Sequence, residues 1–281
     1  MLEPAPLRRT VTATRVLAVR DRDGFEQPDR LATEEPMEIR AEGPGHAPVS
    51  IAVTMRTPGH DFELAVGFLC TEGLIHSRDD VASVVYCDLP PGEQQFNVVT
   101  VRLARPFDPE SVKRNFYTTS SCGVCGKASL EQVQLSCTPV ASGPSVPASV
   151  IAGLPGALRE TQRIFEQTGG LHASGLFTPD GEVLSVREDV GRHNAVDKLV
   201  GEALLGGDLP LSERILMVSG RVSFEIVQKA AMAGVPMICA VSAPSSLAVE
   251  SARELGMTVV GFVRGSSFNV YTGPERVQMG G

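Results

Sequence analysis

Three apolar segments near the C-terminus, each followed by a loop of small polar residues, constrain the fold more than any other feature of this sequence. The first two loops lead into helical segments at residues 222–234 and 246–256. Strands that alternate with helices in this way are typical of a parallel sheet flanked by helices. We therefore predict an α/β domain at residues 149–281, with ligands bound at the carboxyl ends of the strands. The three segments, with their loops, are residues 214–220, 236–244 and 257–269.

Two helices and a hairpin are predicted upstream in the same domain. Residues 154–168 place Leu154, Leu158 and Phe165 on one face, with Pro155 in a favourable first-turn position and two glycines at the end. Residues 175–186 form a hairpin around a Pro-Asp-Gly turn, and residues 191–206 form the second helix.

The first third of the chain predicts a separate α+β domain at residues 1–115. Partial alternation and β-branched residues indicate strands at 11–20, 36–41, 48–55, 81–88 and 96–104, with a turn at 21–24. Residues 57–75 have helical spacing, and Gly73 is in a suitable position for the C-terminal cap. Residues 116–148 connect the two domains, and the stretch rich in Pro, Ser and Gly at 137–149 is predicted to be a surface loop.

The composition excludes several functional classes. No apolar run approaches the roughly 18 residues that a membrane-spanning helix needs. A net charge of −8 argues against general nucleic-acid binding, so any anionic ligand must be bound locally. The first ten residues do not resemble a secretory signal, and we expect a cytoplasmic protein with reduced thiols. Four scattered cysteines indicate no disulfide scaffold: Cys70, Cys87, Cys137 and Cys239.

The loops after the three C-terminal strands are candidate phosphate-binding elements. Each combines hydroxyl groups, small residues and free backbone N–H groups, and two of them carry an arginine. A single loop of this kind is more often an ordinary cap or turn, but three at one sheet edge favour phosphate binding. The candidate residues are Ser219, Gly220 and Arg221; Ser242; and Arg264, Gly265, Ser266 and Ser267.

Two further groups of polar residues are weaker candidates. Asp189, His193 and Asp197 follow one another at four-residue steps, which allows a metal site but favours caps and ion pairs with the neighbouring Arg192 and Lys198. His172 either lines a pocket or is a core histidine. We predict no metal site, because zinc sites usually show a second close Cys or His pair.

A Cys-x-x-Cys pair, Cys122 and Cys125, lies among glycines and small residues between the two domains. This spacing brings two sulfur atoms close enough to form a disulfide, share a metal or pass a sulfur atom from one to the other. Burial as two small apolar residues fits poorly beside glycines that leave the sulfurs uncovered. Backbone N–H groups and Lys127 are expected to lower the pKa of the Cys122 thiol.

Four segments together resemble the family of FdhD-type formate dehydrogenase accessory proteins. These are residues 59–75, 120–126, 187–201 and 219–250, and the resemblance runs from about Thr10 to Arg276. It implies a sulfurtransferase that accepts persulfide sulfur from a cysteine desulfurase. The sulfur passes to the molybdenum cofactor, bis-molybdopterin guanine dinucleotide, before the cofactor enters formate dehydrogenase.

The resemblance also carries residue roles and a fold. It implies Cys122 and Cys125 as the sulfur-transfer residues and the segment from Phe262 and Val263 to Ser267 as a cofactor-binding loop, for which GDP is an analogue. It implies a three-layer C-terminal domain similar to cytidine deaminases. The segments that match the deaminase catalytic helices, 191–198 and 219–226, contain neither the Cys pair nor the catalytic Glu, so deaminase chemistry is not expected.

One alternative from another class remains open. A cofactor-binding maturation adaptor would use the same nucleotide site, with the Cys pair as a redox or zinc element only. The sequence does not decide which cysteine is loaded first, nor does it identify the desulfurase and the client enzyme. We expect a homodimer, and the sequence leaves open whether the cofactor site is shared between subunits.

Overall fold

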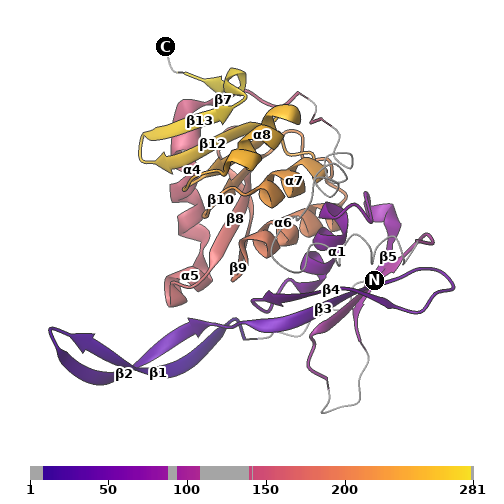
Figure 1. Ribbon diagram of the computed structural model, residues 1–281, viewed down its shortest axis with the longest axis horizontal. Coiled ribbons are helices and arrows are strands. Elements are labelled where there is room, and N and C mark those ends of the chain that lie inside the picture. The colour runs from indigo at the N-terminus through magenta and orange to yellow at the C-terminus, as the bar shows by residue number, and fades with distance from the viewer. Residues whose placement is uncertain (1–8, 88–93, 108–138, 141, 280–281) are drawn as a thin grey trace.

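A computed structural model describes residues 9–87, 94–107, 139–140 and 142–279 of the 281-residue chain (Figure 1). None of the helices in these ranges is long and apolar enough to cross a membrane. In the first half the elements are β1 (Val11–Arg20), β2 (Asp23–Ala32), β3 (Glu35–Glu42), β4 (Val49–Arg56), α1 (Asp61–Thr71), η1 (Arg78–Asp80), β5 (Val81–Tyr86) and β6 (Val98–Leu103). In the second half they are β7 (Val146–Pro147), α4 (Ala148–Thr161), α5 (Arg163–Thr168), β8 (His172–Phe177), β9 (Val183–Asp189), α6 (Arg192–Gly206), β10 (Ile215–Val218), α7 (Phe224–Met232), β11 (Met237–Ala240), α8 (Ser246–Glu254), β12 (Thr258–Arg264), β13 (Ser267–Thr272), η2 (Pro274–Arg276) and β14 (Val277–Gln278).

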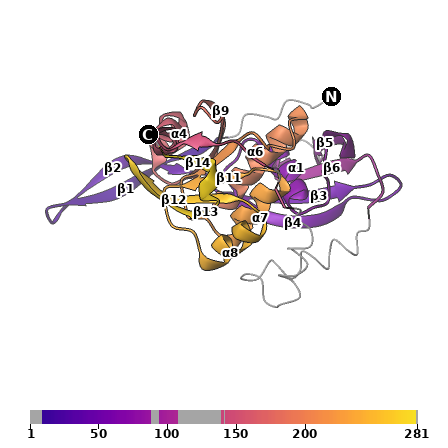
Figure 2. The ribbon, with the colours of Figure 1, turned by 90° about the horizontal axis from the view of Figure 1, so that it is seen from above.

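The C-terminal half forms a six-stranded sheet in the order β13-β12-β11-β10-β8-β9. The predicted parallel strands are β10, β11 and β12, while β8, β9 and β13 pair in the antiparallel sense. Successive residues of each strand point to opposite faces of the sheet. Met217 and Cys239 pack with α4 on one face, whereas Leu216 and Ile238 pack with the cluster that includes α6, α7 and α8 on the other. Figure 2 shows α4 on one side of the sheet and α7 and α8 on the other. The predicted α/β fold is confirmed, and the likeness to cytidine deaminases stays a prediction.

One predicted helix has different boundaries. Instead of a single helix at 154–168, α4 begins at Ala148 with Pro155 in its interior, and α5 follows after a break at Gln162. The apolar residues Ile151, Leu154 and Leu158 extend the buried face upstream of Pro155, and their burial outweighs the preference of proline for a first turn. The preceding loop also contributes to the core, because Val146 is fully buried beside Val277.

The N-terminal half contains a four-stranded sheet in the order β4-β3-β6-β5, with α1 packed on it. A hairpin of β1 and β2 extends away from this sheet as a separate two-stranded ribbon, here called the arm (residues 11–32; Figure 1). The turn predicted at 21–24 is confirmed, with Asp21 and Arg22 both at positive φ. β2 was not predicted, because its polar sequence contains Pro28 and Gly24 and is held as a strand by its register with β1.

The two halves meet along α1 and α6. A Cβ atom built on Gly67 would lie 1.8 Å from the backbone oxygen of Asp197, and one on Gly201 would lie 1.8 Å from that of Glu63. Only glycine permits two helices to approach this closely. The first helix of the N-terminal half therefore fixes the position of α6, whose start lies at the candidate site.

Candidate functional site

The loops after β10, β11 and β12 lie at one edge of the six-stranded sheet. Val218 at the end of β10 pairs with Ala240 at the end of β11. In the next strand, the N–H of Phe262 donates to the carbonyl of Ser242 at 3.2 Å. The structure thus brings Ser219, Ser242 and the loop after β12 to the carboxyl edge, where ligands bind in sheets of this kind.

A pocket of about 570 Å³ opens at this edge on the α4 and α5 side. The Arg159 guanidinium lies over the Phe165 ring, 4.2 Å from its centroid, and gives the pocket a flat cationic wall. Ser219 accepts a hydrogen bond from the N–H of Ala173 at 2.9 Å, and its hydroxyl proton remains able to donate. The lining residues that supply polar groups are Arg159, Gln162, His172 and Ser219.

His172 connects this pocket to a polar cluster at the starts of α6 and α7. A Cβ atom on Gly220 would lie 3.4 Å from Nδ1 of His172 and 3.8 Å from Cδ of Arg192, so the glycine lets both side chains approach the backbone. Nε of Arg192 is buried and has no hydrogen-bond partner among the described residues. An unpartnered buried guanidinium N–H is costly, and an acceptor from a ligand would satisfy it.

His193 lies beside Arg192 in the same cluster. Its Nε2 is 3.2 Å from the Ser223 hydroxyl and 3.8 Å from a Glu225 carboxylate oxygen. Burial, followed by the charges of Arg192 and Lys229, lowers the pKa of His193 to about 4. Burial and Arg192 also lower the pKa of His172. Both rings are therefore neutral at pH 7, and the positive charge of this edge comes from arginines.

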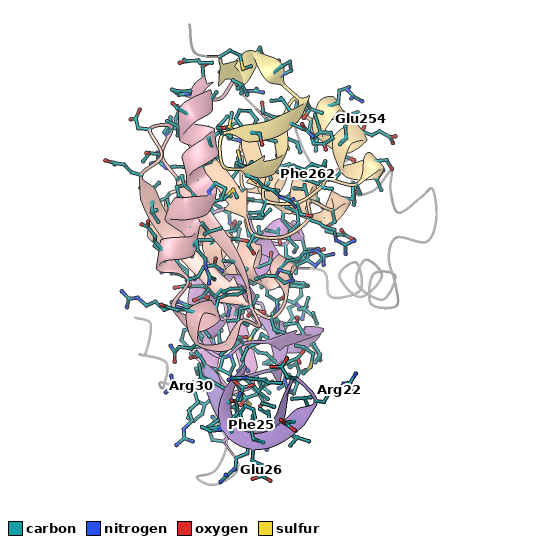
Figure 3. All side chains as sticks on the ribbon, turned by 90° about the vertical axis from the view of Figure 1, so that its left-hand side faces the viewer. Arg22, Phe25, Glu26, Arg30, Glu254 and Phe262 are labelled. Atoms are coloured by element: carbon teal, nitrogen blue, oxygen red, sulfur yellow. The ribbon has the colours of Figure 1, made fainter. Side chains whose placement is uncertain are left out.

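The loop after β12 presents a different surface. Phe262 has a positive φ of 55° and is 37% exposed, and the Arg264 guanidinium lies 5.7 Å from the centroid of its ring. Figure 3 shows Phe262 on the β12 ribbon. Arg264, Gly265, Ser266 and Ser267 are exposed. Val263 is buried in the core, so a ligand can reach only its backbone.

The start of α6 is held in place by the N-terminal half. The Asp189 carboxylate pairs with Lys198 at 2.7 Å and accepts the N–H of Thr57 at 3.1 Å. Asn194 donates to the carbonyl of Met55 at 2.8 Å. Asp189 and Asp197 are therefore partners in ion pairs, as the sequence favoured, and the described part of the chain contains no group of His, Cys, Asp and Glu residues suited to a metal.

The predicted sulfur-transfer residues, Cys122 and Cys125, lie outside the described residues. Of the cysteines that the structure does describe, Cys70 and Cys239 are buried and Cys87 is half-buried. Burial raises the pKa of the Cys70 thiol to about 12 and raises that of Cys239 as well. Neither buried thiol is suited to nucleophilic sulfur chemistry.

Sequence reasoning missed three pocket residues: Arg159, Gln162 and Phe165. The sequence predicts one continuous helix over 154–168, whereas the break at Gln162 turns α5 so that these side chains line the pocket. The two glycines after α5 were the only local signal, because they mark a close turn next to His172.

A model of the FdhD/NarQ family matches residues 32–278. The chain belongs to the FdhD/NarQ family. It is 52% identical over 278 residues to a protein of Streptomyces coelicolor named sulfur carrier protein FdhD, which covers 96% of this chain and 97% of that protein. A protein of the same name from Mycobacterium tuberculosis is 51% identical, over 89% of this chain and 92% of the relative.

A solved structure supports the same assignment. The crystal structure of a protein described as a formate dehydrogenase accessory protein, from Desulfotalea psychrophila, has a TM-score of 0.73 and 25% identity. It covers 96% of this chain, and this chain covers all of it. The FdhD/NarQ match includes the pocket, the polar cluster and all three loops at the sheet edge, and it begins where the arm ends.

Proposed function

We propose that this protein is a sulfur carrier that transfers persulfide sulfur from a cysteine desulfurase to the molybdenum cofactor for formate dehydrogenase. The observation that carries the proposal is the identity of about 50% to sulfur carrier proteins FdhD over most of both chains. The sequence adds the Cys-x-x-Cys pair, whose chemistry matches that name.

In the proposed reaction the Cys122 thiolate attacks the terminal sulfur of the desulfurase persulfide. The desulfurase cysteine leaves as a thiolate, and Cys122 carries the extra sulfur. Attack of Cys125 on the inner sulfur forms a Cys122–Cys125 disulfide and releases hydrosulfide, so the carried sulfur gains the two electrons that the two thiols lose. A cellular thiol reductant then restores the dithiol. If Cys122 and Cys125 exchange their roles, the atoms and electrons of the reaction balance in the same way.

The substrate in this proposal, bis-molybdopterin guanine dinucleotide, carries phosphates and guanine rings. Several features of the sheet edge suit such a molecule. The buried Nε of Arg192 lacks an acceptor, and the exposed Arg221 and Arg264 have no acidic partner among the described residues. The flat pair of Arg159 and Phe165 suits a guanine ring.

The sulfur-carrier function is tested by incubating the protein with a cysteine desulfurase and cysteine and measuring the intact mass. We expect one added sulfur on the wild type, on the peptide that contains Cys122 and Cys125. We also expect Cys122→Ala to abolish formate dehydrogenase maturation without loss of the fold. Cys87→Ser is the matched control, because it removes a half-buried thiol and should retain sulfur loading.

Full maturation activity in a Cys122→Ala, Cys125→Ala double variant would contradict the sulfur-carrier proposal. A protein that binds GDP but accepts no sulfur would instead be the maturation adaptor described above. Stoichiometric bound zinc, measured by metal analysis, would indicate that the Cys pair is a structural element.

A further inference from the structure

Gln162 is a nearly buried polar side chain at the break between α4 and α5. It is 6% exposed, and it lines the pocket at the sheet edge. Its backbone N–H donates to the Arg159 carbonyl at 3.2 Å, and its carbonyl accepts the N–H of Glu166 at 3.1 Å. No described residue bonds to its side-chain amide. Since a nearly buried amide is costly when it is unpaired, it favours a ligand that offers both an acceptor and a donor.

The pocket that Gln162 lines has the size and the surfaces of a small-molecule site. Its volume of about 570 Å³ lies within the roughly 300–1,000 Å³ that such sites have. Leu158, Leu171 and Val241 give it apolar walls, and no carboxylate is among the described residues that line it. The pocket therefore suits a flat, uncharged ring system whose polar edge faces Gln162.

The turn that places Gln162 in the pocket is held by Glu188 of β9. The Glu188 carboxylate accepts the N–H of Ile164 at 2.9 Å and that of Phe165 at 2.7 Å. These two bonds cap the start of α5 and fix the position of Phe165, over whose ring Arg159 lies. Gln162 and the flat pair of Arg159 and Phe165 thus belong to one braced turn, as a recognition site requires.

We propose that Gln162 reads the edge of the nucleobase that stacks on the flat pair of Arg159 and Phe165. A side-chain amide presents one acceptor and one donor side by side in a plane. Guanine presents N1–H and O6 side by side, so the amide oxygen accepts N1–H while the amide nitrogen donates to O6. The identity of the base as guanine rests on the function proposed above.

The other polar residues of the pocket cannot make this pair of bonds. Arg159 only donates, and the Ser219 hydroxyl offers a single oxygen that already accepts the N–H of Ala173. The neutral ring of His172 has one donor and one acceptor nitrogen, but the two point in different directions. Stacking tolerates every base, because every base has a flat face. Selection among bases in this pocket therefore depends on Gln162.

The test compares three diphosphates that differ only in the base. GDP and inosine diphosphate (IDP) both present N1–H and O6, whereas purine riboside diphosphate has neither group. IDP and purine riboside diphosphate share the rest of the ring system, the ribose and the phosphates, so they differ only at the edge that Gln162 is proposed to read. Calorimetric titration of the full chain measures the three affinities.

Gln162→Met removes the amide and keeps a side chain of similar length. We expect it to weaken GDP and IDP binding by roughly tenfold to a hundredfold, because N1–H and O6 lose their partners. The affinity for purine riboside diphosphate should hardly change. Gln167→Met is the matched control, because it makes the same substitution at an exposed residue of α5 and should leave all three affinities unchanged.

The wild type provides a measurement that does not depend on the folding of a variant. It should bind purine riboside diphosphate about tenfold more weakly than IDP. Equal affinities of the wild type for these two ligands overturn the role of Gln162, as does a Gln162→Met variant that weakens all three ligands alike. In either case GDP still binds, and the proposed cofactor site stands. A wild type that binds none of the three overturns both, while sulfur loading of Cys122 tests the carrier function separately.

Discussion

The contact between the two halves contains buried, paired charges, whereas the carboxyl edge of the sheet carries exposed arginines. At the contact, Lys229 lies between Asp197 at 2.9 Å and the Thr71 hydroxyl at 2.9 Å, all of them buried. At the edge, Arg221 and Arg264 are exposed and have no acidic partner in the part of the chain that the structure describes.

Buried charges with a partner stabilise the fold, whereas exposed charges without a partner are available to bind a ligand. Burial alone would lower the pKa of Lys229, but the carboxylates of Asp197 and Glu72 outweigh it and raise that pKa, so the lysine stays charged. A buried charge of this kind stabilises the fold only while its partner is present. An exposed arginine without a partner contributes little to stability and can be used for binding.

The largest effect on stability is expected for Lys229, the buried charge at the contact between the halves. Lys229→Met leaves the Asp197 carboxylate buried without a counter-charge, and we expect the free energy of unfolding to fall by about 3–5 kcal/mol. Adding Asp197→Leu removes the uncompensated charge and should recover part of the loss. Urea unfolding of the two variants and the wild type measures both effects.

The matched control is the exposed pair of Arg102 and Glu42, with side chains 52% and 29% exposed. Arg102→Met should cost less than about 1 kcal/mol. Equal losses for Lys229→Met and Arg102→Met would show that the contact between the halves does not depend on its buried charges.

Arg264→Ala tests the other side of the comparison. We expect it to weaken GDP binding by roughly 1.5–3 kcal/mol, because under the proposed function it would remove a charge-assisted contact to phosphate. The free energy of unfolding should be unchanged. Calorimetric titration measures the affinity, and unaltered GDP affinity would remove Arg264 from the site. The same result for Arg221→Ala would remove the proposed phosphate contacts from this edge.

The smallest effect concerns His193, which lies in the polar cluster at the edge. Because its pKa is lowered to about 4 in the folded protein, the stability linked to this group is complete above about pH 6.5 and is lost as the pH falls through 4. Its side chain is 35% exposed, so screening by water reduces the expected loss to about 1–2 kcal/mol.

His193→Gln should remove this part of the acid sensitivity. Urea unfolding at neutral and acidic pH measures it as the difference between variant and wild type. His46→Gln, in an exposed loop, is the control and should leave the acid sensitivity of the wild type in place. An unchanged pH dependence in His193→Gln would mean that burial and the charges of Arg192 and Lys229 do not lower the pKa of this ring in the folded protein.

Much of the fold could be predicted because its signals are local. The strands 214–220 and 236–244 are short apolar runs between loops, and Gly73 and Gly169 mark helix ends with positive φ. β2 and the break at Gln162 could not be predicted, because each depends on a distant partner. β2 is a strand through its register with β1, and α4 begins early because Ile151 is buried against the sheet.

Some residues of the candidate site could likewise be predicted from the sequence, and others could not. The loops with Ser219, Ser242 and Arg264 could be placed together, since the ends of parallel strands share an edge. The contribution of Arg159 and Phe165 could not, because it results from the angle between α4 and α5. The sequence indicates Arg192 only as a neighbour of Asp189. Its buried Nε, which has no partner among the described residues, follows from the position that β4 gives to the start of α6.

The contact of Gly67 with Gly201 also bears on how the proposed nucleotide cofactor would reach the pocket. The two backbones meet at these glycines, and polar contacts between the halves flank them: Lys229 donates to the Thr71 hydroxyl, and Lys198 donates to the Thr57 carbonyl. The residues that line the pocket belong to the second half of the chain, so the pocket does not lie in the contact between the halves. Under the proposed function, a nucleotide would enter the pocket without crossing the contact between the halves. A partner protein that covers this edge of the sheet would then control access to the proposed cofactor.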